Sequence, residues 1–480
     1  MSSPRISLIA AWIAILACAG LWISLDDLLP KETQNAATEP LEPGNAALAP
    51  QMMVGFKEVF MGKVVVSLLS LESVTQNKNL AGQQISALLS PTQPPVMVVC
   101  GAILLTRAED FTQARSAMQE VITRVERDPT AAPPGFLEVA ALVDQGILDV
   151  AEPAGHHELS DAQQETLEAT FGWFGELLNS TGDSNPLFEA SLASSAWTIA
   201  IAMGVFLSLA TIAGLWGFVW LVILAVRSAG ATLAKPLAEP LSTATRLPWI
   251  FAAWFALTLL LSVGVALIAT RAGRLHGGLP LFLQLASMCL PLIALAIGRR
   301  RGVSWKQVCH DVGLHCGRGF WREFFYGFTV WATAIPMLIV GALIAFALSL
   351  LLSKELADAG HPLPEAIVQG STLTRIVLFF LAAVAAPIVE EIVFRGVLFR
   401  HLRDLSHTWG RGLSFVAAAL GSSFVFAAIH PQGILFIPIL GALAFAFCLA
   451  RETRGSLISC MVAHGFHNGL IVSFVVTLSS

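Results

Sequence analysis

The sequence predicts an all-α, polytopic membrane protein: a helical bundle of about nine spans, with a further, mainly helical domain between the first and second spans. Two observations predict this fold class. Of 480 residues, 55% are hydrophobic and only 13% are charged, about half the charged share of an ordinary soluble protein. The apolar residues also gather in blocks near the roughly 20 residues that cross a bilayer. This composition excludes a disordered chain, a disulfide scaffold and a nucleic-acid binder with a basic face.

The distribution of charged residues divides the chain into an acidic segment and a mostly apolar, basic remainder. Residues 26–195 hold 23 acidic and 8 basic side chains, whereas the remainder holds 10 acidic and 20 basic ones. We therefore expect a membrane anchor at 1–25, an acidic extracytoplasmic domain at 26–195, membrane helices at 196–310 and a membrane core at 311–480. Only Cys100 lies in the acidic domain, so an internal disulfide is excluded there.

The first apolar block, residues 6–25, carries no charge and is long enough to cross the bilayer once. Residues 15–18 resemble a lipoprotein cleavage box. The apolar run continues to Leu25, which favours an uncleaved anchor over a cleaved signal peptide.

Helical periodicity in the acidic domain predicts helices over Phe111–Val125 and Ala162–Leu178, the second starting near Asp161. The apolar run Val96–Leu105 is too short to span a membrane. His156-His157 is more typical of a solvated turn than of a metal site.

Eight more apolar blocks follow the acidic domain. If Arg5 lies inside the cell, the loops alternate so that 15 basic residues fall inside and 4 fall outside. This bias predicts a multi-pass protein of the cell membrane, with the N-terminus inside and residues 26–195 outside. The blocks are Trp197–Val226, Trp249–Thr270, Leu279–Gly298, Phe324–Leu352, Leu373–Phe399, Leu413–Ile429, Gly433–Ala450 and Ser456–Leu478.

One loop carries Cys309-His310 and His315-Cys316, two thiols and two imidazoles of the kind that bind zinc. A short basic connector between two membrane helices is the favoured interpretation.

Two adjacent acids, Glu390 and Glu391, lie inside an apolar block. A carboxylate within the membrane costs several kcal/mol unless it is paired or hydrated, so it indicates function. Arg395 follows Glu391 by four residues and shares its helix face, which predicts an ion pair. Glu390 is turned about 100° away and is free to act as a general base. A purely structural ion pair would leave Glu390 unexplained.

Two further blocks carry polar residues. His430 follows Phe426 by four residues, and His464 and Asn468 share a helix face. A lone histidine in an apolar helix is more often a packing residue. Together with a glutamate, however, these groups are what activating a water requires: a base, imidazoles that hold the water or a metal, and an amide that stabilises an oxyanion.

The expected depths of these residues disagree. At about 1.5 Å per residue from the inner end of each span, Glu390 lies roughly 14 Å deep, His464 roughly 12 Å and His430 roughly 26 Å. A tilted helix, a re-entrant start to the 400–413 connector or shifted span boundaries would remove the difference.

The motifs Glu-Glu-x-x-x-Arg at 390–395, Phe-x-x-x-His at 426–430 and His-x-x-x-Asn at 464–468 resemble the CPBP family. This family contains CAAX-prenyl-protease-like and Abi intramembrane endopeptidases. The resemblance implies a protease core at 311–480 that hydrolyses a membrane-associated peptide or protein. It also implies that the N-terminal anchor and the acidic domain are additions, which we expect to recognise a substrate or a partner protein.

The resemblance further implies a role for each motif residue. Glu390 would activate the water, His430 and His464 would hold the water or a metal, and Asn468 would stabilise the oxyanion. Glu391 would be anchored through Arg395. Zinc held by Glu390, His430 and His464 is compatible with the family, although the sequence has no His-Glu-x-x-His motif.

Two other functions stay open at this stage. One is a non-catalytic membrane scaffold or a bacteriocin-immunity-type binding protein, which the large external domain would suit. The other is a proton-coupled transporter, which would show paired repeats and broken helices in both halves. The sequence shows no such repeats.

Overall fold

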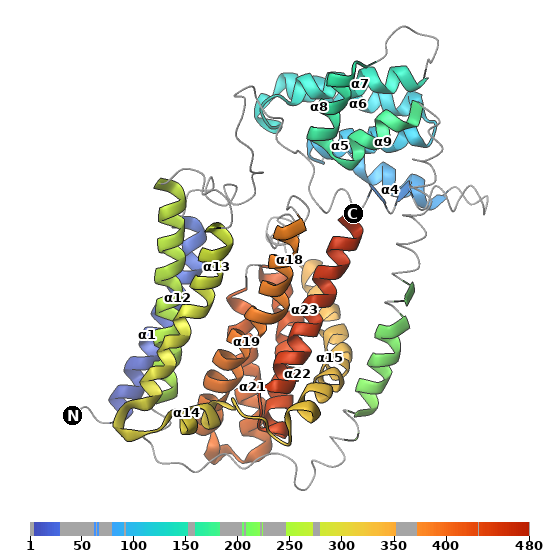
Figure 1. Ribbon diagram of the computed structural model, residues 1–480. Coiled ribbons are helices and arrows are strands. Elements are labelled where there is room, and N and C mark those ends of the chain that lie inside the picture. Colours follow the sequence, from blue (N-terminus) through green and yellow to red (C-terminus); the bar gives the residue numbers. More distant parts are fainter. Residues whose placement is uncertain are drawn as a thin grey trace. The chain divides into compact units, whose positions relative to one another are not determined.

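A computed structural model of the chain describes residues 4–28, 62–63, 65–66, 79–90, 93–151, 159–182, 204–205, 208–220, 223, 246–271, 279–351, 372–430 and 432–479. The regular elements in these ranges are helices, without strands, so the all-α prediction is confirmed (Figure 1). The chain forms two compact units. One comprises Met1–Leu41 and Leu207–Val475, and the other comprises Glu42–Phe206 and Val476–Ser480.

Among the described residues, seven helices are long and apolar enough to cross a membrane, so the multi-pass prediction is confirmed. The first two predicted blocks are described over shorter apolar helices, Ile6–Ala19 and Ser208–Trp220. The seven are Arg246–Ile268, Leu281–Arg299, Phe320–Ser349, Thr372–Leu405, Arg411–Ala428, Ile434–Arg454 and Ile458–Val476.

The membrane unit is built from the following elements. They are α1 (Pro4–Leu28), α12 (Arg246–Arg271), α13 (Leu279–Cys289), η2 (Leu290–Gly302), α14 (Trp305–Val312), α15 (Phe320–Ser349), α18 (Thr372–Phe380), η3 (Leu381–Ala385), α19 (Ala386–Glu390), η4 (Glu391–Leu398), α20 (Phe399–Leu405), η5 (His407–Trp409), α21 (Arg411–Ala428), η6 (Ile434–Phe436), α22 (Ile437–Arg454) and α23 (Ile458–Ser479).

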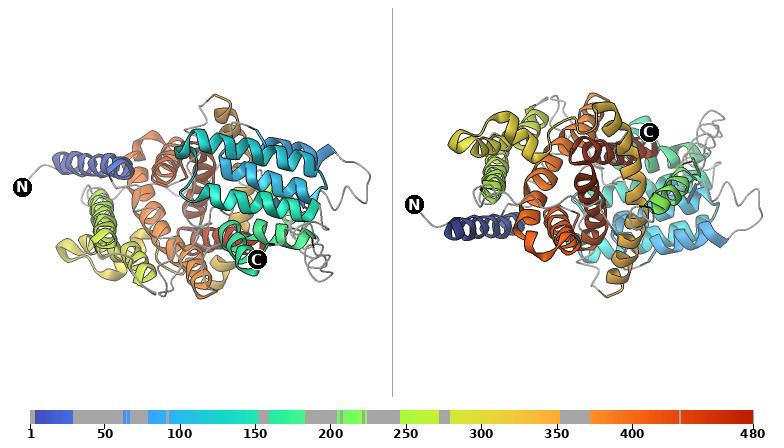
Figure 2. Two further views of the ribbon diagram at one scale, coloured as in Figure 1. Left: turned by 90° about the horizontal axis from the view of Figure 1, so that it is seen from above. Right: turned by 90° about the horizontal axis from the view of Figure 1, so that it is seen from below.

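Helix α22 lies at the centre of this unit and packs against α15 and α21 (Figure 2). Glycines allow the close approaches. A Cβ on Gly341 of α15 would lie 2.6 Å from the Pro438 carbonyl oxygen, and one on Gly327 would lie 2.6 Å from Val462. The wide apolar surface that stays exposed, such as Leu343 and Phe346 of α15, is what a lipid-facing helix presents.

The N-terminal helix is packed into the membrane unit against α12. The Trp12 Nε1–H donates to Nε2 of the buried His401 at 3.2 Å, and the Trp249 indole donates to the Ser7 hydroxyl at 3.0 Å. Ile15 is buried in the cluster that contains Phe251 and Trp254 of α12.

The loop that carries Cys309, His310, His315 and Cys316 forms α14 and the connector to α15. The rings of His310 and His315 stack 4.9 Å apart, and Cys316 is exposed. Among the described residues, no group of three or more His, Cys, Asp or Glu side chains is arranged to hold a metal ion. The connector is tied to the start of α23, where the Leu457 N–H donates to the Gly313 carbonyl at 3.0 Å.

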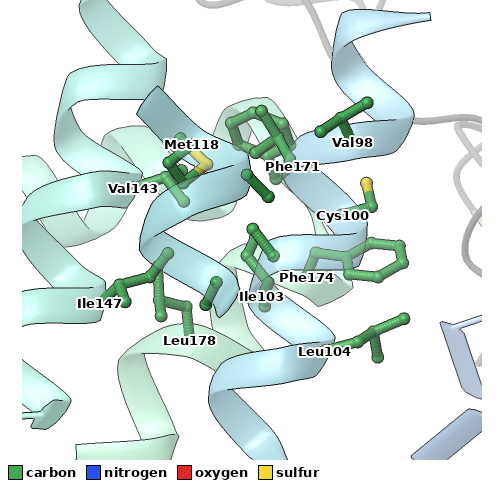
Figure 3. Packing of buried hydrophobic residues seen from close by; sticks show 14 of the residues in the cluster. Val98, Cys100, Ile103, Leu104, Met118, Val143, Ile147, Phe171, Phe174 and Leu178 are labelled. Carbon is green, nitrogen blue, oxygen red and sulfur yellow. The ribbon is translucent and has the colours of Figure 1, made fainter. Parts of the chain in front are cut away.

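The second unit is a small helical domain with its own apolar core (Figure 3). The run Val96–Leu105 lies in its most buried helix, which explains an apolar segment too short to span a membrane. The pair His156-His157 lies outside the described residues. The elements are α4 (Asn79–Leu88), α5 (Pro95–Arg107), α6 (Phe111–Arg127), η1 (Pro129–Ala131), α7 (Phe136–Ala151), α8 (Asp161–Phe171) and α9 (Trp173–Gly182).

The helix predicted from Phe111 is confirmed as α6, and Asp110 caps it by accepting from the Gln113 N–H. The single helix predicted over Ala162–Leu178 is wrong, because α8 ends at Phe171. Gly172 has φ +54°, a conformation that favours glycine and lets the chain turn into α9.

Candidate active site

The two adjacent glutamates lie in one long helical span, Thr372–Leu405, whose winding changes twice. It is π-helical over Leu381–Ala385 and again over Glu391–Leu398, with a short α-helical stretch between. π-Helical turns are rare and often occur at functional sites. Glu390 is the last residue of α19 and Glu391 is the first of η4, so the pair lies at one of these changes.

Pro387 explains part of the irregular winding. The Ala386 N–H donates to the Leu381 carbonyl, as in a π-turn, so it does not serve the Ala382 carbonyl. The next residue is Pro387, which has no N–H to offer. The Asn468 side chain fills this place, because its Nδ2 donates to the Ala382 oxygen at 3.0 Å. A carbonyl that the backbone of its own helix leaves without a donor is thereby satisfied from α23.

Glu391 is completely buried and has two partners. Its Oε1 accepts from Arg395 Nη1 at 2.8 Å, in the ion pair that the sequence spacing predicted, and from His464 Nδ1 at 2.9 Å. The bond to His464 was not predicted. Since a carboxylate accepts, His464 carries its proton on Nδ1, which leaves the Nε2 lone pair available.

Both histidines direct Nε2 towards Glu390. The Glu390 Oε2 atom lies 3.7 Å from Nε2 of His464 and 4.0 Å from Nε2 of His430. The Nδ1 atom of His430 donates to the Phe426 carbonyl at 2.5 Å, so its Nε2 also carries a lone pair. The side chain of Glu390 is 23% exposed, that of His430 19% and that of His464 only 4%. Such separations exceed a direct hydrogen bond and suit atoms that share one water.

The depth at which His430 meets Glu390 differs from the sequence expectation, because the spans do not begin at one level. The span that carries Glu390 continues to Leu405. Near its end, Arg403 donates to Ser414 at the start of α21 at 2.6 Å. Helix α23 begins much nearer the site, since a Cβ on Gly396 would lie 3.3 Å from Leu457. The predicted depths counted residues from one common inner surface for all spans. This assumption therefore placed His430 too far from Glu390.

Asn468 lies one helical turn beyond His464. One of its two amide N–H groups is engaged by Ala382, so a single donor is left for another acceptor. Helix α23 lies very close to η3 at this point, because a Cβ on Gly465 would be 2.3 Å from the Ala383 carbonyl oxygen.

The metal hypothesis can be compared with this geometry. Glu390, His430 and His464 offer one carboxylate and two imidazole nitrogens, which are ligand types of zinc. Two ligands at 2.0–2.1 Å from a tetrahedral zinc lie about 3.3 Å apart, closer than the observed 3.7 and 4.0 Å. Glu390, His430 and His464 are thus of suitable ligand types, but their ligand atoms lie farther apart than those of a bound zinc ion.

Sequence reasoning missed Phe447, which is completely buried and lies 5.2 Å from the His464 ring. It falls in the apolar stretch of α22, where nothing in the sequence distinguishes it from the neighbouring Phe445. Only the packing of α22 against η4 and α23 reveals it.

Comparison with known families covers this part of the chain. Residues 372–470 match the family model described as type II CAAX prenyl endopeptidase Rce1-like, and the matched segment contains all three motifs. Residues 372–470 of this chain are thus similar to proteins of the CPBP family. A curated protein similar to part of this chain is the membrane-embedded CAAX protease MroQ of Staphylococcus aureus (strain USA300), 31% identical over 98 residues.

The similarity to MroQ covers 20% of this chain and 39% of the relative. The segment matched by the family model, residues 372–470, contains the span Thr372–Leu405 and most of α23, together with α21 and α22. No solved structure matches the chain.

Proposed function

We propose that this protein is an intramembrane endopeptidase of the CPBP family that cleaves a membrane-associated peptide or protein. The observation that carries the proposal is the convergence of two imidazole Nε2 atoms on the Glu390 carboxylate, 3.7 and 4.0 Å away. Beside it lies a second carboxylate, Glu391, whose charge is compensated by Arg395. A scaffold has no need for a partly exposed glutamate without an arginine or lysine partner within the membrane.

The proposed steps of peptide hydrolysis follow from which side chains carry a proton and which offer a lone pair. Glu390 takes a proton from a water held between it and the imidazoles of His430 and His464. The resulting hydroxide forms a bond to the scissile carbonyl carbon, and the remaining Asn468 N–H donates to the oxyanion. When the C–N bond breaks, the proton on Glu390 passes to the leaving amine.

Zinc remains part of the hypothesis. If a metal is resident, Glu390, His430 and His464 would hold it, and it would supply Lewis-acid polarisation of the scissile carbonyl. Metal analysis of the purified protein tests this independently of activity. Stoichiometric zinc that is lost in His430→Ala and retained in the control His407→Ala would support it, and a metal-free active protein would overturn it.

The decisive experiment for the proposed function is comparative membrane proteomics of cells that carry the wild type, Glu390→Ala or His430→Ala. His407→Ala is the matched control, since His407 lies outside the three motifs and bonds the backbone carbonyl of Asp404. Cleaved peptides should be lost in both site variants and kept in the control. Full phenotypic rescue by Glu390→Ala would favour a scaffold, and ion flux in reconstituted vesicles would favour a transporter.

We also propose that the basic loops face the cytoplasm, so that the N-terminus lies inside and the acidic domain outside. Cys316, which is exposed in the loop between two spans, is a natural reporter. A membrane-impermeant maleimide should label it in inverted vesicles and not in intact cells. Labelling in intact cells would reverse the orientation. The acidic domain, in this proposal, recognises the substrate or a partner protein.

A further inference from the structure

The buried Arg395 has fewer hydrogen bonds than its charge requires. Its side chain is 1% exposed, and Nη1 donates to Glu391. Its Nε and Nη2 atoms have no acceptor among the described residues. A buried ion pair is stabilising only if its remaining polar atoms are also compensated. Something other than hydrogen bonds must therefore compensate the guanidinium.

Two aromatic rings supply this compensation. The Arg395 guanidinium carbon lies over the Phe426 ring, 4.5 Å from its centroid, and over the Phe447 ring, 5.1 Å from its centroid. Both rings are buried, at 1% and 0% exposure. The negative faces of aromatic rings attract a guanidinium within about 6 Å, and the attraction is strongest where water is excluded.

The same two rings contact the histidines. The Phe447 ring lies 5.2 Å from the His464 ring at 30°, and the Phe426 ring lies 4.3 Å from that of His430. Phe447 belongs to α22, whereas the groups it contacts belong to η4 and α23. Phe447 therefore contacts both the Arg395 guanidinium, which neutralises Glu391, and the His464 imidazole, which Glu391 orients.

We propose that Phe447 is a positioning residue for the proposed hydrolysis: with Phe426 it holds the Arg395 guanidinium between two aromatic faces, which fixes the position of the Arg395–Glu391 pair and thereby the orientation of His464. The inference rests on the proposed function. It assigns no contact with the substrate to Phe447, so the effect should appear in kcat and leave KM unchanged.

The test uses a quenched fluorescent peptide built on a cleavage sequence found by the proteomic comparison. Phe447 is replaced by mono-, di- and trifluorinated phenylalanines, which keep the ring's shape and progressively weaken its negative face. We expect kcat to fall in the same order, by about tenfold for the trifluorinated ring, with KM unchanged. Phe447→Leu should be at least as impaired.

Phe415→Leu is the matched control, because Phe415 is equally a buried ring but contacts Phe399 and Phe445 rather than the site. A second measurement needs no turnover: the NMR chemical shift of the His464 Nδ1 proton, assigned with His464→Gln, should move progressively across the fluorinated series and stay unchanged in Phe415→Leu.

Equal kcat across the fluorinated series would overturn the proposal and leave Phe447 as a packing residue, even if Phe447→Leu were impaired. Retained cleavage by Glu390→Ala would instead overturn the proposed function itself, so the two failures are distinguishable.

Discussion

His464 and Glu391 are joined by a hydrogen bond of 2.9 Å between Nδ1 and Oε1, and this bond decides what the opposite side of the imidazole can do. It fixes the proton on Nδ1 and directs a lone pair on Nε2 towards Glu390. Of the two adjacent glutamates, the buried one thus orients the histidine and the partly exposed one is available for chemistry. Their neutral substitutions should separate these roles.

Glu391→Gln should destabilise the protein strongly, whereas Glu390→Gln should abolish activity with little effect on stability. Removing the charge of Glu391 leaves Arg395, at 1% exposure, without its ion-pair partner, which costs about 3–5 kcal/mol. Glu390 has no cationic partner that would be left uncompensated in the same way. Thermal unfolding of the two purified variants, with cleavage of the peptide substrate, checks the contrast. Equal loss of stability would show that our assignment of the two roles is wrong.

Gly465→Ala should disrupt the site by pushing α23 away from η3. The added Cβ would lie 2.3 Å from the Ala383 carbonyl oxygen, a backbone atom that cannot move aside cheaply. We expect a loss of several kcal/mol in stability and no measurable cleavage. Gly441→Ala is the control, since nothing lies within 4 Å of its Cβ on α22. A Gly465→Ala variant as stable and active as the control would contradict the close packing.

Acidification should destabilise the connector between α14 and α15 through His315. Burial, and then the like charges of His310 and Arg451, lower the pKa of His315, while Glu323 opposes the shift. The unfolded chain therefore binds a proton more readily than the folded one, so stability falls as the pH drops through the ordinary histidine pKa of about 6.5. Thermal unfolding between about pH 7 and pH 5 measures this. His315→Gln should flatten that profile and Cys316→Ser should not, and a profile unchanged by His315→Gln would refute the assignment.

Local spacing was sufficient to predict part of the site. The four-residue interval between Glu391 and Arg395 sets a shared helix face, and the ion pair forms as expected. The long apolar blocks likewise predicted the spans, because span length is set by bilayer thickness.

The remainder depends on irregular backbone and on contacts between distant segments. Three features leave no periodic signal in the sequence. They are the π-turns around Pro387, the level in the membrane at which α23 begins, and the position of the Phe447 ring beside the site. The split between α8 and α9 was missed for a related reason, since the hydrophobic pattern continues through Gly172 while the backbone turns there.

The pairing of Asn468 with Ala382 leads to a test of non-additivity. Asn468→Ala should remove the donor that satisfies the Ala382 carbonyl, at a cost of about 1–3 kcal/mol in stability. Pro387→Ala supplies a backbone N–H next to that carbonyl and allows ordinary helical winding. In the Pro387→Ala background the loss caused by Asn468→Ala should therefore be smaller, with a coupling of about 1 kcal/mol between the two sites. Thermal unfolding of the two single variants and the double variant measures the coupling. Strict additivity would mean that the amide and the proline do not act on the same carbonyl.

Pro387→Ala should also lower kcat, because ordinary helical winding would change the backbone turn that precedes Glu390. If this variant loses activity without losing stability, the proline determines the geometry of the site rather than folding.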